Sequence, residues 1–424
     1  MRRTDHEGHG PVRFGPPLPE PGFPVLPELS RALTDAAGAT AAHPVGGGPA
    51  LLDAACGYWA RRGLSTGRGH VAAAPGAPPL LLALTAVLGG DVLLPRPCPA
   101  WWGPQARLIG RSVFHVPTPA ECGGVPDPYA LLETVRRVRA EGGDPRLLVL
   151  SVADDPTATV PPPEVLHATV EAAADAGLHV VSDETWRDTL HPYPTTPRAD
   201  DGSRRPVLLG PAEMHPDRVT VVVDLAGAFL PGGWPAAVAR FPSTDEGRRL
   251  SDAVLDVLTA VGGRIAAPVA AVAAHALAEP EGVTARLTAS ARVHGAVATA
   301  AHRAVQRAGA FALPPRAGRH LYVDLGPLRP ALAVRGVNDA QELEDYLTGL
   351  LGMPAPGGHR FGDDLGALRV RLATAPLLGT TEQQRAETLT ASDPLEMPYV
   401  ARALTMFGTA FDDLRADAQR REPR

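Results

Sequence analysis

The sequence predicts an α/β fold in which a large domain carries a mostly parallel sheet and a smaller α/β domain follows it. Two observations support this class. Short, continuously apolar segments alternate with longer segments that place apolar residues at helical spacing along much of the 424-residue chain. Continuous apolar strands are typical of parallel sheets that are buried on both faces. A chain of this length also buries a large core and holds two or three domains.

The first part of the chain shows this alternation clearly. Residues 1–25 are rich in Pro and Gly and predict an arm or loop. The predicted helices are then Pro27–Ala37, Ala50–Arg62, Leu80–Leu88, Trp102–Ile109, Tyr129–Glu141 and Pro163–Ala176. The predicted strands are Asp91–Leu94, Ser112–Val116, Arg146–Val152, His179–Ser182, Val219–Leu225 and Ala236–Arg240.

The second part predicts a smaller unit. A helical stretch, Glu246–Ala278, is interrupted by glycine and proline, and a long helix, Ala285–Ala308, follows it. Two strands, Arg319–Leu325 and Ala367–Ala373, then flank a helix at Ala340–Leu351. We expect an N-terminal arm and small-domain segment at 1–45, a large domain at 46–280, a small domain at 281–380 and a helical extension at 381–424.

Composition narrows the class of function. Hydrophobic residues make up 45% and charged residues 20%, as in ordinary globular proteins, and the net charge of −6 argues against a nucleic-acid partner. Three irregularly spaced cysteines indicate free thiols in a reducing compartment. The N-terminus lacks an apolar signal core, and no uncharged apolar run is long enough to span a membrane. We therefore expect a cytoplasmic protein without a membrane partner.

The chain contains no lysine, because all 40 residues in its Lys plus Arg count are arginines. A guanidinium stays protonated and cannot act as an amine nucleophile. The sequence also lacks the glycine-rich nucleotide motifs and the Gly-x-Ser-x-Gly motif. Its histidines show no metal-ligand spacing, so no metal site is expected.

Several segments carry a family pattern in order along the chain: Gly15–Phe23, Gly76–Ala83, Gly90–Gly110, Leu150–Thr157, Val180–Trp186, Val222–Ala236 and Leu368–Ala373. Together they resemble the class I/II aminotransferases, the fold-type-I enzymes that use pyridoxal phosphate (PLP). The likeness extends from Phe14 to Leu378. It implies the fold-type-I architecture, PLP as cofactor and a homodimer with sites at the subunit interface.

The resemblance assigns three residues to the cofactor ring. Asp183 stands where a family aspartate pairs with the ring nitrogen, and its alternative role is to accept bonds from local amides. Asp155 replaces an asparagine that bonds the ring oxygen, and a carboxylate accepts but cannot donate. Trp186 replaces a tyrosine that donates to the same oxygen, so packing is its more natural role.

The lysine segment of the family corresponds here to Asp224–Trp234, and Gly227 falls at the Schiff-base position. Glycine there also raises the alternative of a backbone conformation that a side chain cannot adopt. Asp224 and Ala226 replace the two motif serines, and the phosphate-binding arginine downstream is missing. Gly76 and Ala77 open the helix under the cofactor phosphate, where a negative Asp224 would oppose a dianion.

At most of the remaining site positions the residue type differs from the one in the family pattern. Pro78 removes a backbone donor near the phosphate, although proline is also normal in a first helical turn. His43 stands where a tyrosine reaches the neighbouring subunit, and Pro99 aligns with the stacking aromatic. Trp101 or Trp102 is an alternative stacking residue or a core residue. Arg369 stands at the position whose arginine binds the substrate carboxylate in the family. Its alternative role is an ion pair with an Asp or Glu of the protein. Arg371 lies two residues further on and shares the same strand face.

These losses predict a degenerate homologue, a pseudo-enzyme that acts as a binding or partner subunit. It would form a homodimer or a heteromer with an active relative, and its PLP binding would be weak or absent. The alternative is an enzyme that holds PLP, its amine form PMP or a small carboxylate ligand without a covalent bond. Asp183 and Arg369 would remain in use in that enzyme.

Overall fold

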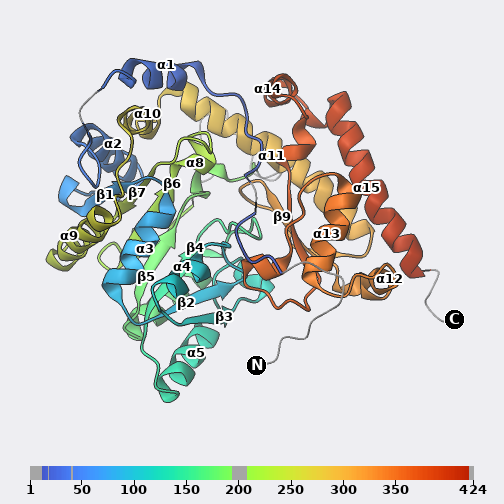
Figure 1. The fold of residues 1–424 in the computed structure, drawn as a ribbon, viewed down its shortest axis with the longest axis horizontal. Coiled ribbons are helices and arrows are strands. Elements are labelled where there is room, and N and C mark those ends of the chain that lie inside the picture. The colour runs from blue at the N-terminus through green and yellow to red at the C-terminus, as the bar shows by residue number, and fades with distance from the viewer. Residues whose placement is uncertain (1–11, 18, 40–41, 193–207, 420–424) are drawn as a thin grey trace.

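The computed structural model describes residues 12–17, 19–39, 42–192 and 208–419 (Figure 1). A seven-stranded sheet has the order β1-β7-β6-β5-β4-β2-β3. Its strands are β1 (Val71–Ala74), β2 (Asp91–Arg96), β3 (Val113–Pro117), β4 (Pro145–Ser151), β5 (His179–Asp183), β6 (Val219–Asp224) and β7 (Ala237–Arg240). Only β7 runs antiparallel to its neighbours among these strands of the described chain, so the predicted mostly parallel sheet is confirmed.

Both faces of this sheet are buried, as the apolar strands predict. Val180 and Val181 are successive residues of β5 and belong to different hydrophobic clusters, because successive side chains point to opposite faces. One cluster includes residues of α3 (Ala77–Leu88), α4 (Trp102–Leu108) and α9 (Asp245–Ala260). The other includes residues of α1 (Pro27–Ala36), α2 (Pro49–Ala60), α5 (Pro128–Ala140), α6 (Pro163–Asp175) and α10 (Ala267–Leu277).

Strand β1 was not predicted from the sequence. It contains one valine and three alanines, and alanine is depleted in strands. Its pairing with β7, which lies far along the chain, decides its conformation.

The smaller unit is built on an antiparallel sheet of order β10-β9-β8, with β8 (Phe311–Ala312), β9 (His320–Asp324) and β10 (Arg369–Ala373). Helix α11 (Glu281–Arg307) runs diagonally in Figure 1 from near α10 toward this unit. The unit also contains α12 (Arg329–Val334), α13 (Ala340–Leu351), α14 (Glu382–Thr390) and α15 (Pro398–Gln419). Phe407 and Phe411 of α15 lie in one hydrophobic cluster with Leu321 of β9, so the C-terminal helix shares the core of this unit.

Short elements complete the described chain. Two one-turn helices, α7 (Pro211–Met214) and α8 (Leu225–Ala228), flank β6. The 3₁₀ turns are Arg68–His70, Ala120–Cys122, Arg187–Thr189, Gly326–Leu328, Gly358–Phe361, Ala375–Leu378 and Pro394–Glu396. The three cysteines are free, as the sequence predicts. Within the described residues, no helix combines the length and the apolar character that a membrane crossing requires.

Candidate functional site

A cavity of about 430 Å³ lies where the large sheet, the smaller unit and the N-terminal arm meet. Asp155, Trp186 and Gly227 line it and lie in the segments that follow β4, β5 and β6. The carboxyl ends of parallel strands are where open α/β sheets bind ligands. The other charged or titratable lining side chains are Glu20, Arg286, His294, Arg319, His320 and Arg371. The cavity is therefore the candidate functional site.

Gly227 lies within the short helix α8 and does not have the positive φ that would require glycine. The alternative of a special backbone conformation is therefore wrong. A β-carbon at Gly227 would lie 3.2 Å from the ring of Trp186 and 3.3 Å from Cγ2 of Thr185. The Arg319 guanidinium donates a hydrogen bond to the Gly227 carbonyl oxygen. Neighbouring side chains, rather than backbone strain, restrict what this position holds.

Asp224, Gly76 and Ala77, which the family resemblance assigns to the phosphate position, are not among the residues that line the cavity. The two carboxylate oxygens of Asp224 accept hydrogen bonds from the backbone N–H groups of Ala77 at 2.8 Å and Ala226 at 2.9 Å. Gly76 is the N-cap of α3 and has φ of +98°. The first N–H of the helix, that of Ala77, points to this carboxylate. Pro78 takes its ordinary place in the first turn. Burial raises the pKa of Asp224.

Asp155 is the centre of a polar network in the lining of the cavity. Its Oδ1 accepts a hydrogen bond of 3.1 Å from Trp186 Nε1, and its Oδ2 accepts one of 3.0 Å from Arg371. His320 Nδ1 lies 3.7 Å from Oδ1. Both oxygens of Asp155 are thus bound by protein groups, and Trp186 is a hydrogen-bond donor as well as a packing residue.

The arginine that lines the cavity is Arg371, and Arg369 is not among the lining residues. Arg369 forms ion pairs with Asp324 at 2.9 Å and Asp363 at 3.1 Å. Asp324 is its direct partner across the β9–β10 ladder, so strand register brings the two together. The ion-pair alternative for Arg369 is therefore what the structure shows.

The pocket residues that the sequence did not single out include Glu20, Arg319 and His320. His320 Nε2 lies 2.8 Å from Glu20, and Arg371 lies 3.7 Å from the same carboxylate. Burial opposes ionisation of Glu20, but His320, Arg371 and Arg319 together lower its pKa to about 2. Arg319 lies over the Trp186 ring at 4.8 Å. Glu20 lies in the Pro-rich segment Gly15–Phe23, which carries part of the family pattern but does not mark this residue.

Asp183 ends β5 and is buried, but it is not among the residues that line the cavity. It accepts a hydrogen bond of 3.0 Å from the Thr185 N–H, as in its alternative role as acceptor for a local amide. Burial raises the pKa of Asp183 to about 7, because the charged form is poorly solvated there.

The aromatic candidates and His43 lie outside the cavity lining. Trp102 is 1% exposed and packs edge to face with Trp101, with ring centroids 6.2 Å apart. Both tryptophans join a core cluster with Cys98, which supports their reading as core residues.

Taken together, the residues present do not fit a covalently held PLP. No lysine exists, and the backbone donors at the phosphate position are bound by Asp224. The ring-oxygen position is occupied by a carboxylate whose donors come from Trp186 and Arg371.

Curated relatives match part of the chain. A probable aspartate/prephenate aminotransferase of Thermus aquaticus is 30% identical over 154 residues, 36% of this chain and 35% of that protein. An aspartate aminotransferase of Pyrococcus horikoshii is 22% identical over 155 residues, 37% of this chain and 35% of that protein. The chain thus spans about a third of the length of these relatives.

Solved structures match almost the whole fold. A Thermus thermophilus aspartate aminotransferase variant has a TM-score of 0.74 at 21% identity, covering 94% of this chain and 96% of that chain. The enzyme of the same organism with maleate has a TM-score of 0.71 at 21% identity, covering 94% and 90%. The fold-type-I architecture is thereby confirmed. The family model for aminotransferase class I and II matches residues 23–352, and the chain belongs to this family.

Proposed function

We propose that this protein is a degenerate aminotransferase homologue, a pseudo-enzyme that binds a small carboxylate ligand and acts as a cytoplasmic binding or partner subunit. The observation that carries the proposal is the pair of hydrogen bonds from Ala77 and Ala226 to the Asp224 carboxylate. These amides are the groups that a phosphate would use at a helix start. An ionised Asp224 repels a dianion at that place, so PLP binding is weak or absent.

Arg319 is the proposed anchor for the carboxylate ligand. It lines the cavity, and within the described chain it has no carboxylate within ion-pair distance, whereas Arg371 already contacts Asp155 and Glu20. Burial lowers the pKa of Arg319, yet a guanidinium remains charged at neutral pH. A planar guanidinium binds a carboxylate through two parallel hydrogen bonds. The Thermus thermophilus enzyme with maleate suggests that dicarboxylate as a probe.

The absence of lysine also limits which chemistry a homodimer or a heteromer of this chain could perform. A second copy of this chain would bring no lysine to a shared site, because the sequence has none. A homodimer would therefore have no lysine amine for a Schiff base, whereas a heteromer with an active relative would regain one from that relative.

The test is calorimetry of the full chain with maleate, using Arg319→Gln and, as a matched control, Arg369→Gln. We expect maleate binding by the wild type and the control, and binding at least about tenfold weaker in Arg319→Gln, since one charged hydrogen-bonded pair contributes roughly 1.5–3 kcal/mol. In parallel, PLP should produce no absorption band of a Schiff base. Submicromolar PLP binding, or equal maleate binding by all three proteins, would contradict the proposal.

Asp183 favours a second candidate, an enzyme that holds PLP or PMP non-covalently. Its carboxyl is buried and belongs to the last residue of β5, the place that the resemblance assigns to the partner of the ring nitrogen. Turnover of a keto acid with added PMP, abolished by Asp183→Asn, would support this candidate over the first.

A further inference from the structure

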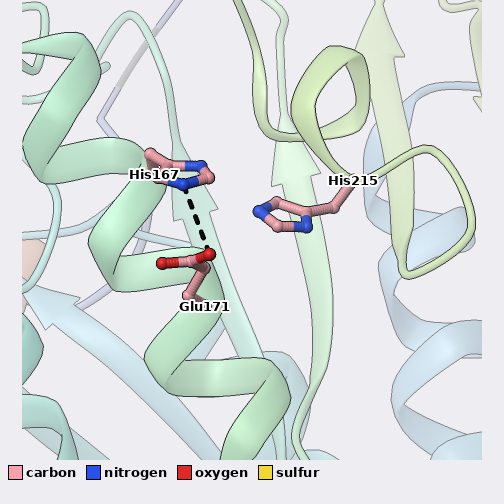
Figure 2. Close-up of side chains that lie close together, drawn as sticks. All are labelled: His167, Glu171 and His215. Carbon is pink, nitrogen blue, oxygen red and sulfur yellow. Dashed lines mark ion pairs between the residues drawn. The ribbon is translucent and has the colours of Figure 1, made fainter.

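A second cluster of reactive side chains lies on helix α6 and directly after α7 (Figure 2). His167 and Glu171 are one turn apart on α6, and His215 is the C-cap residue of α7. One ligand atom from each residue lies within 4.8 Å of the other two. His167 Nε2 is 3.3 Å from Glu171 Oε1. None of the three residues lines the cavity described above.

Two features of His215 point to a missing partner. Its Nε2 atom is buried and has no hydrogen-bond partner in the described part of the chain. A buried polar atom without a partner is costly, so such atoms call for an explanation. Figure 2 shows the His215 ring turned toward His167 and Glu171, with a ring nitrogen facing them. The two imidazole rings are almost parallel, 13° apart, with centroids at 5.2 Å.

The charges around the cluster are mixed. The negative charge of Glu171 favours a positive charge at His215, and the positive charge of Arg218 disfavours it. His167 and Glu171 are about half exposed, so their side chains are able to rotate toward a common centre. Imidazole nitrogen and carboxylate oxygen are the ligands that zinc accepts, at about 2.0–2.2 Å.

We propose that His167, Glu171 and His215 form a Zn²⁺ site, with water completing the coordination. Two ligands come from one face of a helix, and the third comes from a separate element packed against it. The 4.8 Å spread of the ligand atoms closes to the spacing of a tetrahedral site by small side-chain rotations. Histidine spacing in the sequence predicts no metal site, because only two of the three proposed ligands are close along the chain.

Such an ion would link α6, through His167 and Glu171, to the end of α7, through His215. Glu213 of α7 also forms an ion pair with Arg187, and Arg187 Nη1 lies 2.5 Å from Glu184, the residue after β5. A zinc ion at His215 therefore stabilises the elements that support the end of β5. Binding to the folded state alone raises the thermal midpoint with zinc concentration.

The experiment is calorimetry of the untagged full chain with ZnCl₂, together with thermal midpoints and Co²⁺ absorption spectra. The variants are His167→Ala, Glu171→Gln and His215→Ala. His275→Ala is the control, because His275 lies 3.5 Å from Glu28 in an isolated histidine–carboxylate pair. We expect one zinc ion per chain, a raised midpoint, and affinity at least roughly tenfold weaker in each ligand variant, since even outer-shell losses cost 10–100-fold.

The control should bind zinc like the wild type and show the same visible Co²⁺ bands. Absence of stoichiometric zinc binding would overturn the proposal. So would binding that His215→Ala leaves unchanged, because His215 is the ligand that joins the two elements.

Discussion

The carboxylate of Asp224 accepts a hydrogen bond of 2.8 Å from the backbone N–H of Ala77, which lies 147 residues earlier in the chain. The bond joins the end of β6 to the first residue of α3. A second bond, from the Ala226 N–H, engages the other carboxylate oxygen. The protein thus satisfies with its own side chain two backbone donors at helix starts, where an anion could otherwise bind.

Replacing Asp224 by serine should increase the affinity for inorganic phosphate and for PLP. The change removes a negative charge next to the anion and frees the Ala77 donor. We expect a gain of about fivefold or more, because two charges 4 Å apart interact by roughly 1 kcal/mol even in bulk water. Calorimetry measures both ligands. Asp224→Asn is the matched control, since it removes the charge but keeps a side chain over the amides. Equal affinities in all three proteins would show that Asp224 is not the obstacle.

Introducing lysine at Gly227 should not restore amino-group transfer. Its β-carbon would lie 3.2 Å from the Trp186 ring, and Asp224 and Asp155 would still occupy the phosphate and ring-oxygen positions. Correct orientation lowers the activation free energy by roughly 7–11 kcal/mol at best, and a loosely held cofactor ring loses much of this contribution. The assay uses added PLP and a panel of amino and keto acids. Gly227→Ala and circular dichroism control for folding, and turnover typical of transaminases would refute this expectation.

Breaking the Arg371–Asp155 pair should destabilise the fold. The two side chains lie 3.0 Å apart and are 8% and 19% exposed, so removing one partner leaves a poorly solvated charge. We expect Arg371→Gln to lower the free energy of unfolding by about 3 kcal/mol, while Arg371→Gln with Asp155→Asn costs less than the sum of the single changes. Urea denaturation measures both, with exposed Arg137→Gln as the control. Additive costs would mean that the pair is not coupled.

Asp183 should make stability depend on pH. Burial raises its pKa to about 7 from an unfolded value near 3.9, so the unfolded chain ionises first as the pH rises. The stabilising contribution is fully present below pH about 4 and is lost as the pH rises to about 7. Asp183→Asn should therefore gain stability relative to the wild type between pH 4 and 7 in urea midpoints.

The comparison with the variant is needed because other groups titrate in the same range. Burial lowers the pKa of His179 to about 4, which acts in the opposite sense, and raises that of Asp154 to about 8. Asp154→Asn serves as the second variant. A constant difference between Asp183→Asn and the wild type across this range would show that Asp183 is ionised in the folded protein.

The sequence by itself determined the features that depend on residue identity and local pattern. The missing lysine is a matter of composition, and the prediction that Gly227 stands at the Schiff-base position, close to Asp224, rests on residue order. The parallel sheet followed from apolar strands such as Val219–Leu225, because burial on both faces requires a continuous apolar run. Strand β1 escaped prediction because its alanines carry little intrinsic preference.

Only the tertiary structure decided which side chains meet. The β9–β10 register pairs Arg369 with Asp324 and leaves Arg371 to line the cavity, although both arginines share a strand face. Glu20 reaches His320 across 300 residues, and His215 reaches His167 from another element. Such contacts depend on packing between distant segments, and local spacing carries information only about neighbours on one helix or strand.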